Sequence, residues 1–194
     1  MNPDERKVLN KSQKINHWSA QKLYYDIGKN YQRSWTVKRG EVYFVNLGEN
    51  VGSEENKLRP VVVLQSNAYN FRSPVFTCAI ISTSPISIPD IQVPLIGHYP
   101  YTDNNGVVKN LSGAVDLGQI KTIGKERIVS NAICQLSANE MKDINLKLFN
   151  AIGLSSVIIS KDNTIASLNG KIEYLNEQLN KKMSIDIDNF TENE

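Results

Sequence analysis

The chain has few cysteines and no long apolar run, and each shortage excludes a class of protein. Its 194 residues include two cysteines, Cys78 and Cys134, and neither has a metal-ligand neighbour at useful spacing. We therefore expect two buried, reduced thiols and no metal site. The longest apolar patch, around residues 151–159, is interrupted by Gly153 and two serines and is too short to span a bilayer. Because the first fifteen residues are polar and charged and do not resemble a signal peptide, we expect a soluble cytoplasmic protein.

An excess of one charge sign is also lacking, since the formal net charge is only +2. No global basic field therefore marks a nucleic-acid binder. The charge is nevertheless uneven along the chain. Residues 1–39 hold nine Lys or Arg against three Asp or Glu, a net +6, whereas residues 161–194 hold four against seven, a net −3. The two ends could attract each other, or the basic end could contact a polyanion.

Familiar catalytic sets are missing as well. The sequence has no metal-ligand cluster, no nucleophile elbow and no phosphate-binding glycine loop. Its two histidines, His17 and His98, lie in an N-terminal stretch and in a long loop, and their spacing does not support a two-histidine ribonuclease. His17 stands beside Trp18 in an amphipathic stretch, which is more typical of a packing pair than of a site.

Short strands dominate the middle of the chain. We predict them at residues 37–47, 60–66, 74–82, 90–95, 112–123 and 127–134, with a polar turn at 67–73 and a long loop at 97–111. The four apolar residues 61–64, three of them β-branched, indicate a strand buried on both faces, and Pro60 fits its start because it has no N–H to donate. Strands without crossover helices, followed by one helix, predict a small antiparallel barrel with an α appendage.

Helical patterns bracket these strands. Residues 2–33 suggest one or two amphipathic helices, and Ser137 followed by Glu140 forms an N-capping box that opens a helix over 137–154. Apolar residues spaced 3, 4, 3 and 4 then form an a/d heptad seam that permits a parallel dimer, unless the helix packs on its own domain or on the N-terminal helix. The seam consists of Ile165, Leu168, Ile172, Leu175 and Leu179.

We therefore divide the chain into four parts. They are a basic helical extension at 1–36, a barrel domain at 37–157, a heptad-patterned helix at 158–183 and a disordered acidic tail at 184–194.

An ordered series of motifs runs through the barrel domain. In sequence order these are Arg39-Gly40-Glu41-Val42-Tyr43, Gly52-Ser53-Glu54, Arg59-Pro60-Val61-Val62-Val63-Leu64-Gln65, Ser73-Pro74, an apolar strand ending at Ser82, Leu117-Gly118-Gln119-Ile120-Lys121-Thr122-Ile123, Lys125-Glu126-Arg127-Ile128 and Ile152-Gly153-Leu154. In order and spacing they resemble the PemK/MazF family, the toxins of bacterial type II toxin–antitoxin pairs. The resemblance covers residues 38–154.

This resemblance implies a fold and a reaction. The expected fold is mainly β with α, a small SH3-like antiparallel β-barrel with a C-terminal helix, here with helical N- and C-terminal extensions. The family implies a homodimer that cleaves single-stranded RNA, such as mRNA, without a metal or other cofactor and leaves 2′,3′-cyclic phosphate and 5′-hydroxyl ends. It also implies a cognate antitoxin that covers the RNA groove, and operator DNA bound through the toxin–antitoxin complex.

The resemblance assigns the catalytic roles to Arg59 and Ser82. Cleavage of a phosphodiester builds negative charge on the nonbridging oxygens, and a guanidinium and a hydroxyl supply matching donors. An arginine side chain stays protonated at neutral pH, so charge stabilisation suits Arg59 better than proton transfer. The general base is left unassigned. The expected substrate-binding residues are Ser53, Glu54, Gln65, Asn70, Thr83 and Gln119.

Two departures from the family pattern affect base preference. Gly118 stands where an acidic residue often precedes the glutamine, and Gln65-Ser66-Asn67 replaces the usual Gln-Asn-Asp. Two other functions stay open, both without cleavage. In one, the barrel binds DNA gyrase as related toxins do, and in the other it binds RNA and leaves it intact.

Overall fold

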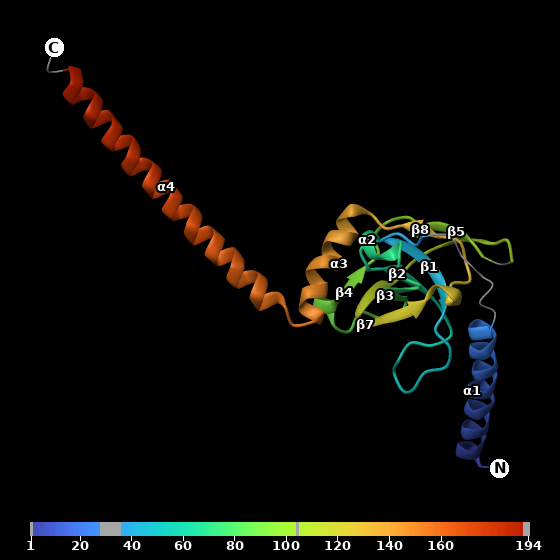
Figure 1. Cartoon of the computed structure of the whole chain (residues 1–194). Helices are drawn as coiled ribbons and strands as arrows, with labels where there is room; N and C mark the ends of the chain where they lie inside the picture. Colours follow the sequence, from blue (N-terminus) through green and yellow to red (C-terminus); the bar gives the residue numbers. More distant parts are fainter. Residues whose placement is uncertain (1, 28–35, 104, 192–194) are drawn as a thin grey trace. The chain divides into compact units, whose positions relative to one another are not determined.

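A curved antiparallel sheet forms the centre of the fold (Figure 1). The computed structural model describes residues 2–27, 36–103 and 105–191. Within these residues, six strands pair in the spatial order β4–β7–β3–β2–β1–β8. They are β1 (Glu41–Asn46), β2 (Leu58–Val63), β3 (Val75–Ser82), β4 (Gln92–Pro94), β7 (Ala114–Gly124) and β8 (Cys134–Gln135). The predicted antiparallel, mainly β architecture is confirmed.

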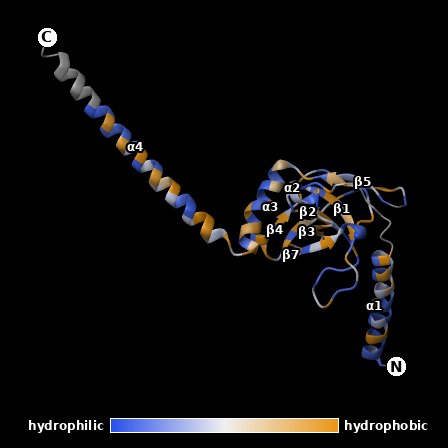
Figure 2. Ribbon diagram, viewed as in Figure 1, coloured by the Kyte–Doolittle hydropathy of each residue, from blue (hydrophilic) through white to orange (hydrophobic). Residues whose placement is uncertain are grey.

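The central strands bury both of their faces. Val61 and Val63 of β2 belong to one apolar cluster and Val62 to another on the opposite face. Figure 2 shows the same apolar character in the strands of the sheet. The prediction of a strand buried on both faces is therefore confirmed, although β2 starts earlier than predicted, because Leu58 pairs with Asn46 of β1.

A bulge interrupts the pairing of β3 with β7. Ala79 pairs with Ile120, but the next residue, Ile80, pairs with Asp116. Residues 117–119 of β7 therefore have no partners in β3 at this point. Bulges of this kind re-aim side chains and are frequent beside active sites. Here the bulge contains Gln119, one of the predicted substrate-binding residues.

The predicted loop at 97–111 is wrong. Two strands, β5 (Pro100–Thr102) and β6 (Val108–Asn110), pair there as a separate hairpin. Its turn depends on Asp103, whose Oδ1 accepts the backbone N–H groups of Asn105 and Val107 at 2.9 and 3.0 Å. A turn held by an aspartate side chain can form a hairpin without an apolar run in its strands. The sequence pattern therefore gave no sign of these strands.

Short helices replace other predicted irregular or extended segments. The predicted turn at 67–73 contains the helix α2 (Asn67–Asn70), and 3₁₀ turns η1 (Pro89–Ile91) and η2 (Lys125–Arg127) precede β4 and follow β7. The predicted strand at 127–134 is reduced to a single bridge between Ile128 and Val45, and to β8.

The capping box predicted at the start of α3 (Ala138–Ala151) is confirmed. The Glu140 backbone N–H donates to Ser137 Oγ at 3.2 Å, and the Ser137 N–H donates to Glu140 Oε2 at 3.1 Å. The buried Glu140 carboxylate also accepts the backbone N–H groups of Ile96 and Gly97 and the hydroxyl of Tyr99. Burial alone would raise the pKa of Glu140, but these donors lower it to about 2.

At the N-terminal end, the described residues form one helix, α1 (Pro3–Ile27), which is one of the two predicted alternatives, while residues 28–33 of the predicted stretch lie outside the described part of the chain. Trp18 is its buried residue, with 6% of its surface exposed. The cations of Lys22 and Arg127 both lie over its ring, 5.5 and 5.1 Å from the ring centroid. The expected packing role of Trp18 therefore agrees with its position.

The second compact unit, residues 152–194, consists mainly of the helix α4 (Ser155–Thr191), whereas residues 1–151 form the first. The helix extends through 184–191, where we had predicted a disordered acidic tail, and residues 192–194 lie outside the described part of the chain. The five seam residues are 51–63% exposed. No helix among the described residues is long and apolar enough to cross a membrane.

Candidate active site

Arg59 and Ser82 meet in one cleft of about 300 Å³. Arg59 lies near the start of β2, and Ser82 is the last residue of β3. Thr83 lines the same cleft, and its contact with substrate stays a prediction. The β5–β6 hairpin supplies another wall, because the ring of Tyr101 packs edge-on against Phe44 of β1 at 5.4 Å between centroids. A segment that we had predicted to be a loop thus helps to form the cleft.

A carboxylate that sequence reasoning did not select joins the two catalytic candidates. Arg59 Nε donates to Glu55 Oε2 at 2.7 Å, and Ser82 Oγ lies 3.1 Å from Glu55 Oε1, to which it can donate. Ser82 Oγ also accepts the backbone N–H of Ser84 at 3.3 Å, which orients the hydroxyl. Glu55 stands four residues before Arg59 in a charged loop. From the sequence, we predicted substrate binding for its neighbour Glu54 instead, because Glu54 is part of the family motif.

The loop that carries Glu55 is held by amide side chains. The Glu55 N–H donates to Gln119 Oε1 at 2.7 Å, and Asn50 Nδ2 donates to the Glu55 carbonyl at 2.6 Å. Gln119 Nε2 reaches the carbonyl of Ser53 at 3.4 Å. Since Gln119 lies in the β7 bulge, the bulge directs this amide at the loop.

Glu54 takes a different position from Glu55. It is more exposed and pairs with Lys121 Nζ of β7 at 3.2 Å. Gln119 therefore links Ser53 to Glu55, which contacts the catalytic pair, whereas Glu54 forms a separate ion pair with Lys121.

Two other predicted substrate-binding residues lie away from this network. Asn70 is fully buried and its Nδ2 donates to the Gln65 carbonyl at 2.9 Å. Gln65 Oε1 accepts the backbone N–H of Thr77 at 3.3 Å, and the Gln65 side chain lines a separate shallow cavity with Tyr69 and Arg72. Local hydrogen bonds account for the Gln65 side chain and for Asn70 Nδ2, whereas Asn70 Oδ1 is buried without a hydrogen-bond partner among the described residues. Contact of Gln65 and Asn70 with substrate stays a prediction.

A glycine permits the close approach of backbone behind Ser82. Gly113 has φ +117°, and a Cβ atom there would lie 2.3 Å from the Ser82 carbonyl oxygen. Any side chain would therefore push the end of β3 away from the segment leading into β7. This contact positions the Ser82 hydroxyl at the cleft.

The resulting arrangement suits a phosphate. The contact with Glu55 uses the Nε–H of Arg59 and leaves the two Nη amino groups of a guanidinium fork that matches phosphate oxygens. The Arg59 side chain is 39% exposed and the Glu55 side chain 18%, so solvent and ligands reach the pair. Among the described residues, no group of three His, Cys, Asp or Glu side chains is placed to hold a metal ion.

Of the two cysteines, Cys78 is buried as expected, whereas Cys134 is only half-buried. Desolvation raises the pKa of the Cys78 thiol to about 12 and that of Cys134 to about 11. Neither is in a disulfide. A thiol with such a pKa is a poor nucleophile at neutral pH, so the cysteines add nothing to the chemistry of the cleft.

The sequence and the fold have counterparts among known proteins. Residues 38–152 match the family described as the PemK-like, MazF-like toxin of type II toxin–antitoxin system. The chain is 33% identical over 123 residues to the endoribonuclease EndoA of Bacillus subtilis, an alignment that covers 63% of this chain and 97% of that protein. It is 27% identical over 121 residues to the endoribonuclease MazF of Staphylococcus saprophyticus, covering 62% of this chain and 95% of the relative.

A solved structure supports the fold. The crystal structure of MazF (Form-I) from Deinococcus radiodurans aligns with a TM-score of 0.50 at 20% identity and covers 61% of this chain and 98% of that chain. The helices α1 and α4 both lie outside the residues that match the family. The family match, which spans more than half of the chain and includes Arg59 and Ser82, shows that the protein belongs to the PemK-like, MazF-like family of toxins of type II toxin–antitoxin systems.

Proposed function

We propose that this protein is a toxin that acts as a metal-independent, sequence-specific endoribonuclease on single-stranded RNA. One observation carries the proposal. Arg59 and Ser82, which come from different strands, contact the two oxygens of a single carboxylate at the cleft. Relatives that align with this part of the chain are named endoribonucleases, which supports the assignment.

The proposed reaction uses the RNA itself as the nucleophile. The 2′-oxygen attacks the adjacent phosphorus, the O2′–P bond forms and the P–O5′ bond breaks. The products are a 2′,3′-cyclic phosphate and a 5′-hydroxyl, whose oxygen takes up one proton. Because the nucleophile is intramolecular, holding it in line supplies much of the acceleration.

Arg59 and Ser82 stabilise the charge that develops in this reaction. The Nη groups of Arg59 donate to two nonbridging oxygens, and the Ser82 hydroxyl adds a third donor. To do so, the phosphate takes the place that the Glu55 carboxylate occupies between them. Glu55 is then released next to the substrate.

The released Glu55 is our candidate for the general base. A carboxylate within hydrogen-bond reach of the 2′-hydroxyl accepts its proton as the O2′–P bond forms. A guanidinium has no proton acceptor to offer at neutral pH, so an arginine side chain does not suit this role. The position of Glu55 beside both phosphate ligands supports the assignment.

The family also supports proposals about partners. We infer that the toxin works as a homodimer in the cytoplasm, that a cognate antitoxin protein inhibits it, and that operator DNA is bound through the toxin–antitoxin complex. Each follows from membership of a type II toxin–antitoxin family. Light scattering of the purified toxin measures whether it is a homodimer. The same measurement on the toxin mixed with its antitoxin measures whether the two form a complex.

The test of the activity is incubation of purified protein with a long single-stranded RNA in EDTA. We expect discrete cuts with cyclic-phosphate and 5′-hydroxyl ends. Arg59→Ala and Ser82→Ala should each lower the rate by at least about tenfold and keep the fold, because each removes a donor to the transition state. Lys142→Ala, at an exposed lysine of α3, is the control and should cleave like wild type.

Other outcomes would replace the proposal. Intact RNA with measurable binding would indicate an RNA-binding barrel without catalysis. Intact RNA together with inhibition of DNA gyrase would indicate a gyrase-binding toxin. Cleavage by Arg59→Ala at the wild-type rate would refute the mechanism while leaving the activity in place.

A further inference from the structure

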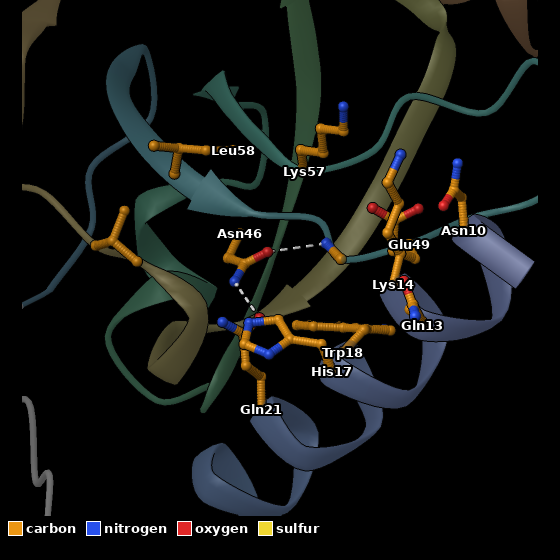
Figure 3. A pocket seen from close by; sticks show the side chains of 12 residues that line it. Asn10, Gln13, Lys14, His17, Trp18, Gln21, Asn46, Glu49, Lys57 and Leu58 are labelled. Carbon is orange, nitrogen blue, oxygen red and sulfur yellow. Dashed lines mark hydrogen bonds between the residues drawn. The ribbon is translucent and has the colours of Figure 1, made fainter.

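A second cavity of about 740 Å³ lies between α1 and the barrel. Figure 3 shows side chains of α1, among them Lys14, His17 and Gln21, facing Asn46 and Lys57 of the barrel. The volume falls in the range of small-molecule and nucleotide sites. None of the residues from α1 lies in the segment that matches the toxin family.

Several contacts hold α1 against the barrel beside this cavity. The Trp18 ring packs against Gly48, where a Cβ atom would lie 2.0 Å from a ring carbon. Asn46 Nδ2 donates to Gln21 Oε1 at 3.3 Å and to the Tyr25 hydroxyl at 3.2 Å. Lys11 Nζ donates to the Asn50 carbonyl at 2.9 Å. The cavity is therefore built from contacts between the helix and the loop after β1.

The cavity has an excess of positive charge. Its one acidic lining residue, Glu49, pairs with Lys11 Nζ at 2.9 Å. The bond from Lys11, together with the nearby charges of Lys14 and Lys57, lowers the pKa of Glu49. With Glu49 already paired, the ammonium groups of Lys14 and Lys57 are left to attract an anion.

Lys57 is held in an unusual backbone conformation. Its φ is +62°, in the left-handed region that a residue with a side chain rarely adopts. The Lys57 N–H donates to the Gly48 carbonyl at 2.6 Å, and its own carbonyl accepts the N–H of Leu47 at 2.7 Å. Glycine would meet no strain here. Backbone strain of this kind is frequent at ligand sites. There a side chain can be retained for binding although a glycine would be less strained.

The cavity adjoins the catalytic cleft. Leu58 lines both, and it immediately precedes Arg59. Leu58 pairs with Asn46, and Pro60 pairs with Phe44, so these four side chains share one face of the β1–β2 pair. Asn46 lines the cavity, while Phe44 and Pro60 line the cleft. The cavity and this part of the cleft therefore follow each other along one face of the hairpin, and the cleft also includes Arg59, whose side chain alternates to the other face.

We propose that this cavity is a subsite for the RNA strand beside the scissile phosphate, an inference that rests on the proposed endoribonuclease function. Lys14 and Lys57 bind a backbone phosphate, and the exposed ring of His17 stacks on a base. The amide of Gln13 lines the cavity and offers donors and an acceptor to a base edge. A strand that continues out of the cleft meets this site next, which favours RNA over a detached small molecule.

The experiment measures binding without cleavage. The probe is a series of single-stranded RNAs with a 2′-deoxyribose at the cut position, which lacks the nucleophile, lengthened by one nucleotide at a time on either side. We expect the affinity of the full-length wild-type protein to rise in a step when the strand on one side reaches the cavity.

Variants assign that step to the cavity. Lys14→Ala combined with Lys57→Gly should abolish the step, weaken binding of the long RNA by about tenfold and lower the salt slope by about 0.7 for each lost phosphate contact. His17→Ala should weaken it roughly fivefold or more. The controls Arg6→Ala on α1 and Lys142→Ala on α3 remove exposed cations outside the cavity and should retain the step.

The outcomes separate this inference from the one on which it rests. Lys57→Gly should melt at or above the wild-type temperature because it relieves a positive φ, so weaker binding would not reflect unfolding. A step of equal size in the double-lysine variant, or no step in the wild type, would overturn the subsite even if all-ribose RNA is cut normally. Failure of the wild type to cut all-ribose RNA would instead overturn the nuclease function.

Discussion

At the scale of single residues, the position of Glu55 has the largest consequence for mechanism. Its carboxylate contacts both Arg59 and Ser82, so a substrate phosphate has to displace it. The neighbouring Glu54 points instead to Lys121 and is mostly exposed. Two adjacent carboxylates thus differ in what they touch, and this difference makes a matched comparison possible.

We predict that Glu55→Gln lowers RNA cleavage by roughly 10²-fold or more, the size expected for loss of a general base. Glutamine has the same shape and keeps one acceptor oxygen for Arg59, while its NH2 group faces the Ser82 hydroxyl oxygen, but it cannot accept the 2′-hydroxyl proton. Glu54→Gln is the control and should change the rate much less. Single-turnover cleavage at several pH values measures both. A wild-type cleavage rate in Glu55→Gln would show that the carboxylate is not the general base and only fills the phosphate position when no RNA is bound.

At the scale of elements, α3 is anchored to the barrel through its first turn. Glu140 closes the capping box and also binds the backbone at Ile96 and Gly97, in the segment between β4 and β5. Its carboxylate is therefore both a helix cap and a tertiary contact. The lowered pKa of Glu140 expresses how strongly these donors favour the ionised form.

We predict that Glu140→Gln lowers the free energy of unfolding by about 3 kcal/mol at neutral pH, the equivalent of lowering a pKa from 4.5 to about 2. Because the folded-state pKa lies below the unfolded one, the stabilisation is complete above about pH 5 and is lost as the pH falls toward about 2. Urea unfolding at several pH values measures this.

The control for this prediction lies on the same helix. Asp143→Asn removes an exposed carboxylate of α3 and should keep the wild-type dependence of stability on pH. An equal acid-induced loss in wild type and Glu140→Gln would count against the role of Glu140.

At the scale of the whole molecule, the chain is a toxin-family domain extended by further helices. The helix α4 carries an apolar seam that is exposed within its own unit. Isoleucine at a and leucine at d positions favour two parallel strands. We therefore propose that α4 pairs with α4 of a second copy and adds to a homodimer.

We predict that Leu168→Glu combined with Leu175→Glu lowers the assembly mass or raises the dissociation constant at least tenfold, since charges at d positions oppose close helix packing. Light scattering over a range of concentrations measures this. Ser167→Glu combined with Tyr174→Glu places the same charges at c positions of α4 and should leave the mass unchanged. Equal masses for all three proteins would indicate that the seam does not pair in this way.

Local pattern alone was sufficient for several features. The two-sided burial of Val61–Val63 follows from consecutive β-branched residues, and the cap of α3 follows from Ser137 and Glu140. The heptad spacing anticipated the helical continuation into α4. These features depend on neighbours in the sequence or on a fixed period, so they can be predicted without a structure. The family motif likewise led to Arg59 and Ser82.

Contacts between distant segments decided the rest. Glu55 and Ser82 are 27 positions apart, and Gln119 reaches the Glu55 loop from a bulge that has no local signal. The sequence also did not predict the burial of Asn70 or the β5–β6 hairpin that forms one wall of the cleft. The cavity behind α1 exists because Trp18 packs on Gly48. Such features depend on which side chains meet once the sheet closes, and residue pattern along one segment does not contain that information.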